Sequence, residues 1–141
     1  MKARHLAVPA ILLLVLAAGC AERSVGGPCA YEDTPGKAVI TAVGGADPDE
    51  ANCAREPRAV LFDFIPDKPR TRWRFPNWGT SGQRLTVAGG MNPPASWLRS
   101  QKVRVGAELS CVRREIVKGT CTPVVYEFPD LDMAAAAEAC R

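Results

Sequence analysis

"VGAELSCVRREIVKGTCTPVVYEFPD", residues 105–130, is the stretch that decides the fold. Runs of β-branched and aromatic residues on both sides of Lys118-Gly119 are typical of two strands joined by a turn. Val124, Tyr126 and Phe128 recur at every second position, which in a strand places their side chains on one face. The stretch therefore predicts an antiparallel hairpin with one buried face.

Earlier segments favour further strands. "KAVITAV", residues 37–43, and "RAVLFDFI", residues 58–65, are rich in β-branched or aromatic residues and are bounded by Gly and Pro. "RTRWRF", residues 70–75, alternates strictly between basic and other residues. "QRLTVA", residues 83–88, is expected to continue the sheet beyond a turn over residues 77–82. About three strands are therefore expected before the hairpin.

Two helices are also expected. In "MNPPASWLRSQ", residues 91–101, Asn92 is predicted as the N-cap and Pro93 as the first helical residue, where its missing N–H costs nothing. This helix is short and should end near Lys102. The alanine run after Asp132 predicts a final helix that this aspartate caps.

The order of these elements, strands followed by a short helix and a hairpin, resembles that of the OB-fold. An OB-fold is a five-stranded barrel, with a helix between its third and fourth strands. The resemblance rests on element order alone. We therefore expect a mainly β domain, a small five-stranded β-barrel or sandwich with one short helix.

The N-terminus indicates an exported protein. Lys2 and Arg4 precede an apolar run of 14 residues, 6–19, which is the pattern of a signal peptide. A permanent transmembrane helix needs about 20 residues, so a cleaved leader is favoured. "LAAGC", residues 16–20, resembles the lipobox of bacterial lipoproteins, which implies cleavage before Cys20 and acylation of its thiol. The alternative is an ordinary secretory signal cut near Ala21.

This resemblance implies a domain organisation and a location. The expected segments are a cleaved signal peptide (1–19), a lipidated tether (20–28), a disulfide-bearing β-rich domain (29–130) and an alanine-rich tail (131–141). The lipid would attach the protein to a membrane of the bacterial cell envelope. Because Ala21 rather than Asp follows the cysteine, the resemblance implies the outer membrane if the cell has one.

Composition excludes several classes of function. Without the leader, 16 Lys plus Arg face 15 Asp plus Glu, and this net charge of +1 does not favour a nucleic-acid partner. The only histidine, His5, lies in the leader. Because histidine is the commonest general base and a leading metal ligand, histidine-based triads and metal sites are excluded. No catalytic residue, metal or cofactor is expected.

Five cysteines remain after Cys20, without a Cys-x-x-Cys pair, and they indicate disulfides rather than a metal site. Cys111 brackets the Lys118-Gly119 turn together with Cys121, although Cys111 could instead reach Cys29 or Cys53. The predicted odd thiol is Cys140, next to the C-terminus. The disulfide candidates are Cys29, Cys53, Cys111 and Cys121.

The most conspicuous candidate site is the basic and aromatic stretch that follows residue 69. As a ligand platform, its arginines would meet an anionic glycan or a lipid headgroup and its rings would stack on the ligand. The alternative is a half-buried strand with its rings packed inward and its arginines solvated. The possible ligand surface comprises Arg70, Arg72, Trp73, Arg74 and Trp78, extended on an OB-like barrel by Arg113, Arg114 and Lys118.

Three hypotheses of function follow from these patterns. The first is a non-enzymatic binding or scaffolding module at the membrane surface, with an anionic glycan, a lipid headgroup or an envelope protein as partner. The second is a hydrolase of envelope glycans without histidine, which would use Asp63 and Glu127 as its pair of carboxylates. The third is a structural subunit of an envelope complex.

Overall fold

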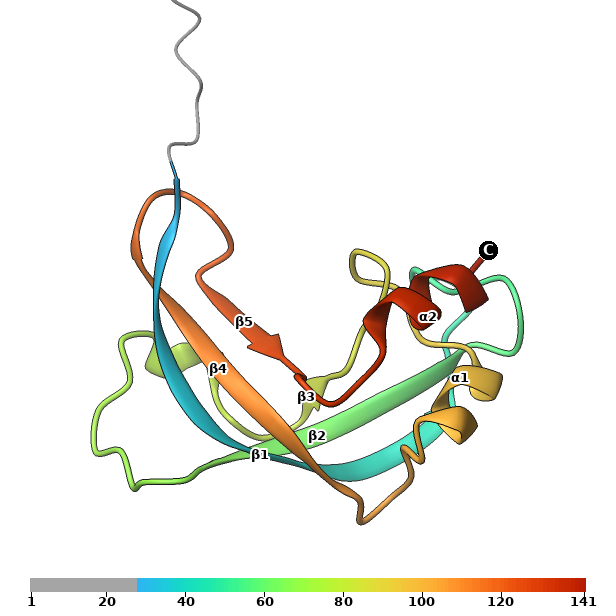
Figure 1. Ribbon diagram of the computed structural model, residues 1–141, viewed down its shortest axis with the longest axis horizontal. Coiled ribbons are helices and arrows are strands. Elements are labelled where there is room, and N and C mark those ends of the chain that lie inside the picture. Colours follow the sequence, from blue (N-terminus) through green and yellow to red (C-terminus); the bar gives the residue numbers. More distant parts are fainter. Residues whose placement is uncertain (1–27) are drawn as a thin grey trace, which may run out of the picture.

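The computed structural model describes residues 28–141, which form a five-stranded antiparallel sheet curled into a half-barrel (Figure 1). The strand order in the sheet is β3-β2-β1-β4-β5, and the mainly β fold is therefore confirmed. The expected signal peptide, Cys20 and all of the tether but its last residue lie outside the described residues. The strands are β1 (Ala30–Gly45), β2 (Arg58–Pro66), β3 (Gln83–Arg84), β4 (Glu108–Lys118) and β5 (Val124–Glu127).

The long strand β1 is the centre of the sheet. Its first part pairs with β4, its second part pairs with β2, and a bulge between Ile40 and Ala42 interrupts the β2 register. A bulge increases the local twist of a strand, which helps the sheet to curl. A Cβ atom on Gly36 would clash with the backbone carbonyl of Ile65 and lie 2.8 Å from ring carbons of Phe64, so this glycine lets both approach β1 closely.

The core fills the concave face of the sheet. The ring of Phe62 on β2 meets those of Tyr126 and Phe128 edge to face, each at a centroid distance of 5.2 Å. The curl therefore brings side chains of β2 and β5 together, although β1 and β4 lie between these strands in the sheet. The predicted common face of Val124, Tyr126 and Phe128 is confirmed, because all three residues pack into this interior.

Two helices pack against each other at one end of the half-barrel: α1 (Ala95–Ser100) and α2 (Met133–Ala139). Trp97 on α1 donates its indole N–H to the carbonyl of Asp132 at 2.9 Å. The predicted cap of the C-terminal helix is confirmed, since the Asp132 carboxylate accepts from the N–H of Ala135. No helix within residues 28–141 has both the length and the apolar character needed to cross a bilayer.

The predicted start of the first helix is wrong. The helix begins at Ala95 after an extended Pro94, and no side chain caps it. A residue that precedes a proline is disfavoured in the helical conformation, so Pro93 cannot open the helix. Asn92 is instead 1% exposed and bonds to Arg84 and to other polar residues in the loop before β2.

The predicted roles of two cysteines are wrong as well. The disulfides join Cys29 to Cys121 and Cys53 to Cys140, and Cys111 is the free cysteine among the described residues. Cys111 lies in the middle of β4 with its side chain on the concave face, 1% exposed. The odd thiol is therefore a core residue, because α2 folds back and brings Cys140 to the loop before β2.

Candidate functional site

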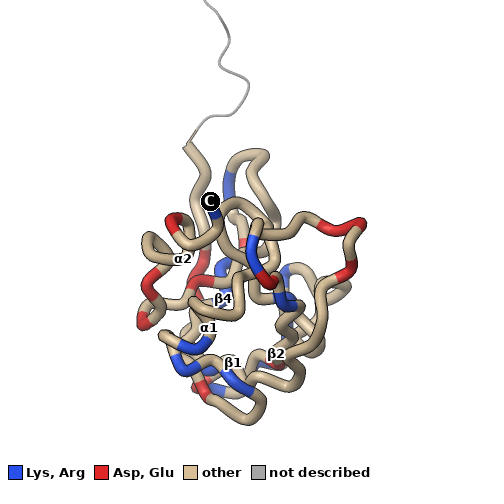
Figure 2. The backbone as a smooth tube through the Cα atoms, turned by 90° about the vertical axis from the view of Figure 1, so that its right-hand side faces the viewer, with Lys and Arg blue, Asp and Glu red and all other residues tan. Residues whose placement is uncertain are grey.

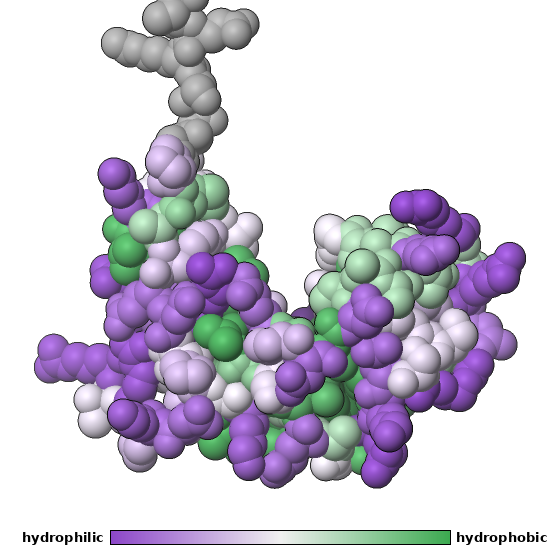
Figure 3. All heavy atoms as spheres, viewed as in Figure 1, coloured by the Kyte–Doolittle hydropathy of each residue, from purple (hydrophilic) through white to green (hydrophobic). Residues whose placement is uncertain are grey.

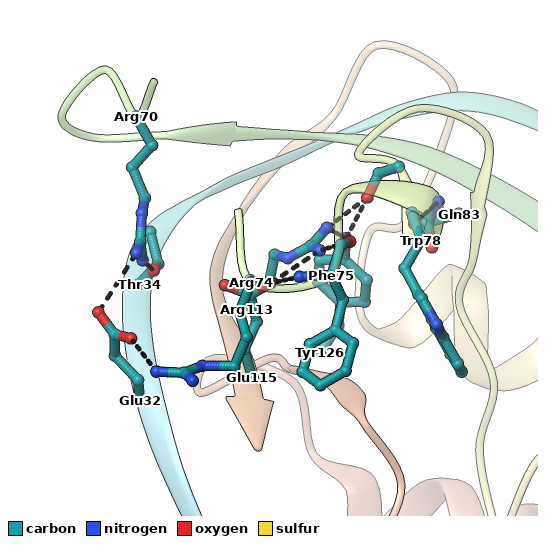
Figure 4. Close-up of polar contacts among 11 residues, drawn as sticks. Glu32, Thr34, Arg70, Arg74, Phe75, Trp78, Gln83, Arg113, Glu115 and Tyr126 are labelled. Carbon is teal, nitrogen blue, oxygen red and sulfur yellow. Dashed lines mark hydrogen bonds and ion pairs between the residues drawn. The ribbon is translucent and has the colours of Figure 1, made fainter. Parts of the chain in front are cut away.

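The predicted strand over residues 70–75 is wrong, because this stretch belongs to an irregular connection, residues 67–82, which we call the strap. The strap joins β2 to β3 and contains the short 3-10 helix η1 (Pro76–Trp78). Side chains of β4, rather than a ladder of backbone hydrogen bonds, hold its centre (Figure 4). Arg113 donates to the carbonyls of Phe75 and Gly79, and Glu115 accepts from the N–H of Phe75 at 3.1 Å.

Arg113 and Glu115 form an ion pair of 3.2 Å in which both side chains are 0% exposed. The Arg113 guanidinium also donates to the Tyr126 hydroxyl at 2.8 Å and lies 4.5 Å from the centre of the Trp73 ring. A buried charge is tolerated when it is paired and hydrogen-bonded, and here each charge has its counter-charge and hydrogen bonds, although Arg113 Nε and Glu115 Oε2 find no hydrogen-bond partner among the described residues. Arg113 is therefore a structural residue and not part of an exposed ligand surface.

Most of the other arginines predicted for that surface are engaged by carboxylates. Glu32 pairs with Arg70 at 3.2 Å and with Arg74 at 3.7 Å, as Figure 4 shows. Arg114 pairs with both Asp33 and Glu127 on the convex face of the sheet. Figure 2 shows both kinds of charge spread along the chain. The predicted residues thus do not form one continuous basic face.

The aromatic residues of that prediction are separated too. Trp73 is half-buried between Arg113 and the ring of Phe64, so it belongs to the interior. Trp78 is 45% exposed and points away from the cluster around Arg113 (Figure 4). Arg72 and Lys118 are exposed. The rings of this stretch therefore do not form a stacking platform.

The two carboxylates of the hydrolase hypothesis are engaged separately. Asp63 on β2 accepts from the N–H of Gly82 at 2.8 Å, and Glu127 on β5 pairs with Arg114. Strands β1 and β4 lie between them in the sheet. Within residues 28–141, no group of three or more potential ligating side chains that could hold a metal ion occurs.

A large hollow lies where the sheet fails to close, between its two edge strands β3 and β5. We call this cleft of about 790 Å³ the seam cleft. Figure 3 shows the hollow between two lobes, with apolar side chains in its floor. One wall comprises residues 122 and 124–129, the other comprises Arg84, Thr86, Gly89 and Gly90, and Met133 of α2 completes the lining.

The short edge strands explain why the seam stays open. β3 has two residues, and the chain then makes a tight turn in which Val87 and Met91 exchange backbone hydrogen bonds. Ala88, Gly89 and Gly90 form this turn with φ angles of 47°, 82° and 114°. On the other wall, prolines at positions 123 and 129 flank β5, and proline cannot donate to a ladder.

The free edge of β5 presents backbone hydrogen-bonding groups to the seam. Ile116 of β4 donates to the carbonyl of Pro123 at 2.9 Å, and residues of an antiparallel pair alternate between bonded and non-bonded positions. By this alternation Val125 and Glu127 bond to β4, while the N–H and C=O groups of Val124 and Tyr126 point to the open side. The structure describes no strand beside them.

The charged residues of the seam cleft are already paired. Arg84 makes two hydrogen bonds to Glu50, at 2.5 and 2.6 Å, and a third to Asn92 at 2.7 Å. The hydrogen bonds from Arg84 and Asn92 lower the pKa of the Glu50 carboxyl to about 2. Glu127 on the opposite wall pairs with Arg114. The cleft therefore offers apolar surface and backbone groups rather than an unpaired charge.

Residues of β5 were predictable from the sequence, but this cleft was not. The walls come from segments about 40 residues apart, and only the curl of the sheet sets them opposite each other. Nothing in the sequence indicates that β3 ends after two residues, since "QRLTVA" has the composition of a longer strand. No protein-family model, no curated protein and no solved structure matches this chain.

Proposed function

We propose that the protein is a lipid-anchored binding module of the bacterial cell envelope and that the seam cleft holds its partner. The cleft between the two open sheet edges is the observation that carries this proposal. Ligand sites are concave and mostly apolar, with a few well-placed polar groups, and volumes of about 300–1,000 Å³ are common among them. The seam cleft has this size and this lining.

The cellular location in this proposal comes from the N-terminal sequence. "LAAGC" follows a short apolar leader, and Cys20 would carry the lipid. The nine residues 20–28 reach at most about 32 Å when fully extended. A domain held by such a tether works at the membrane surface, so the partner is a component of the envelope.

Binding accounts for the cleft better than hydrolysis does. Hydrolysis of a glycosidic bond needs two carboxylates that face one substrate, one of them protonated. Arg84 and Glu127, the charged residues of the cleft, are each neutralised by an opposite charge. The remaining lining suits recognition through shape and backbone hydrogen bonds.

The proposed lipid anchor is tested by mass spectrometry of protein purified from bacterial membranes. The expected N-terminus is an acylated Cys20, and a Cys20→Ala variant should leave the membrane fraction. An unmodified N-terminus at Ala21 or beyond would remove the lipid anchor from the proposal.

The cleft is tested by photo-crosslinking in intact cells that make the full chain. A photoreactive phenylalanine analogue is placed at Thr86 in the cleft or, as the matched control, at the exposed Thr41 of β1. We expect an adduct from position 86 only, and its loss when Thr122→Trp fills the opposite wall. Equal adducts from both positions, or an adduct insensitive to Thr122→Trp, would contradict a partner in the cleft.

A further inference from the structure

We propose that the occupant of the seam cleft is an extended polypeptide segment of an envelope protein, which adds to β5 as a sixth strand and bridges the open half-barrel toward β3. This inference rests on the proposed binding function and names the chemical class of the partner. It follows from the free hydrogen-bonding groups of the two edges, the apolar lining between them and the absence of an unpaired charge.

The backbone groups of both edges favour a strand over other ligands. Val124 and Tyr126 of β5 direct their N–H and C=O groups into the seam. On the other edge, Leu85 donates to the carbonyl of Val60. Because hydrogen-bonded and non-bonded positions alternate along an antiparallel pair, the backbone N–H and C=O of Arg84 point away from β2 and toward the seam. An extended chain has donors and acceptors at the same repeat as these edges, and it would satisfy both.

The ends of β5 limit the length of the added strand. Positions 123 and 129 are proline, and the residues between them span about 17 Å at the rise of a β-strand. A segment of about five residues therefore covers the whole free edge. The volume of about 790 Å³ suits such a short segment better than a helix or a folded surface.

The lining of the cleft defines the side chains of the occupant. Val124, Tyr126 and Phe128 face the concave side, so alternate residues of the added strand would pack on them and should be apolar. On the opposite wall Gly89 and Gly90 carry no side chain, and a Cβ on either would meet nothing within 4 Å. An added backbone can approach this wall closely.

The charge of the cleft completes the description of the occupant. Glu50 neutralises Arg84, and Arg114 neutralises Glu127. A charged side chain placed between these pairs would lose water and gain no counter-charge. The complementary segment is therefore uncharged at its centre.

The experiment measures amide hydrogen exchange by NMR on the purified protein with a model strand. The probe is acetyl-Thr-Val-Thr-Val-Thr-amide, and the control is the same peptide methylated at its three central backbone nitrogens. Because backbone hydrogen bonds carry much of the affinity in strand addition, the probe does not need the sequence of the natural partner. We expect at least a tenfold slowing of exchange at Val124 and Tyr126 with the probe, and no change with the methylated peptide.

A pair of variants connects this effect to the cleft. Thr122→Trp, which fills the cleft, should abolish the slowing, and Thr41→Trp on the exposed surface of β1 should preserve it. Unchanged exchange in the presence of the probe, or equal slowing by both peptides, would overturn strand addition. Protection that rises with protein concentration alone would also overturn it, because a second copy would then occupy the edge. The crosslink at position 86 in cells would persist in each of these cases if the cleft binds a partner in another way.

Discussion

The Arg113 guanidinium donates a hydrogen bond of 2.8 Å to the Tyr126 hydroxyl, and this contact ties a buried ion pair to the wall of the seam cleft. The same hydroxyl lies 3.3 Å from the carbonyl of Gly79 in the strap. β4, β5 and the strap therefore meet at one point. Because each of these groups is held by the others, the β5 wall of the cleft is formed before any partner arrives.

Replacing Arg113 by methionine should destabilise the protein strongly. The change leaves the carboxylate of Glu115 buried without its counter-charge, and breaking a buried ion pair in this way costs about 3–5 kcal/mol. The free energy of unfolding in urea measures the loss. Arg114→Met is the matched control, since this neighbour pairs on the convex, solvent-facing side, where the loss of an ion pair costs less than about 1 kcal/mol. Equal losses for the two variants would contradict the structural role of Arg113.

Removing the disulfide between Cys53 and Cys140 should cost about 4 kcal/mol, because it closes a long loop with a sequence separation of 87. The measurement is urea unfolding of the Cys53→Ala/Cys140→Ala variant. Peptide mapping without reductant should recover the two pairs of the structure, Cys29 with Cys121 and Cys53 with Cys140. A peptide that joins Cys111 to Cys121 would contradict this pairing.

Cys111 should react very slowly with thiol reagents in the folded protein. Burial raises the pKa of its thiol to about 12, and the reactive species is the thiolate. At pH 8 we expect alkylation by iodoacetamide to be at least about 100-fold slower than in urea, where an ordinary thiol pKa of about 8.5 returns. Mass spectrometry of the alkylated protein follows the reaction. Rapid labelling without denaturant would place Cys111 at the surface.

The same shift predicts a loss of stability at alkaline pH. A folded pKa above the unfolded value means that the unfolded chain releases its proton first. The contribution of Cys111 is therefore present below about pH 8.5 and is lost as the pH rises toward 12. The Cys111→Ala variant should lack this part of the decline, which thermal unfolding at several pH values would measure.

Glu50 should stabilise the protein at neutral pH and lose this effect in acid. Its folded pKa of about 2 lies below the ordinary pKa of 4.5, so the unfolded chain takes up the proton first as the pH falls. The stabilisation is present above pH 4.5 and is lost between pH 4.5 and 2. The difference in Tm between the protein and its Glu50→Gln variant should shrink over this range. A constant difference would contradict the shift.

The strands of strong local pattern were predictable from the sequence. "RAVLFDFI" forms β2 almost to the residue, and the stretch from residue 105 forms β4 and β5. In these segments the residues are mostly β-branched or aromatic, types that favour strands, and the sheet uses them as strands. The connection between the strands is longer than a tight turn at Lys118-Gly119, since Pro123 lies opposite Ile116. The constraint of the disulfide from Cys29 to Cys121 at this turn was not visible in the residue pattern.

The basic and aromatic stretch was wrongly predicted as a strand, because its alternation of arginine with other residues reflects tertiary contacts and not a place in the sheet. Arg70 and Arg74 both reach Glu32, and Trp73 packs on Arg113, so tertiary ion pairs and stacking fix the strap without a ladder. The spacing of Cys111, Arg113 and Glu115 at every second position was the available signal. On a strand this spacing puts two opposite charges beside a buried cysteine, which indicates a buried pair.

Amide hydrogen exchange in the free protein tests the open seam most directly. By the register of β5 on β4, the N–H groups of Val125 and Glu127 are bonded, and those of Val124 and Tyr126 face the cleft. We predict that Val124 and Tyr126 exchange at least 100-fold faster than Val125 and Glu127. Equal protection of all four amides at every protein concentration would mean that the half-barrel is closed, and it would contradict the seam cleft as the binding site.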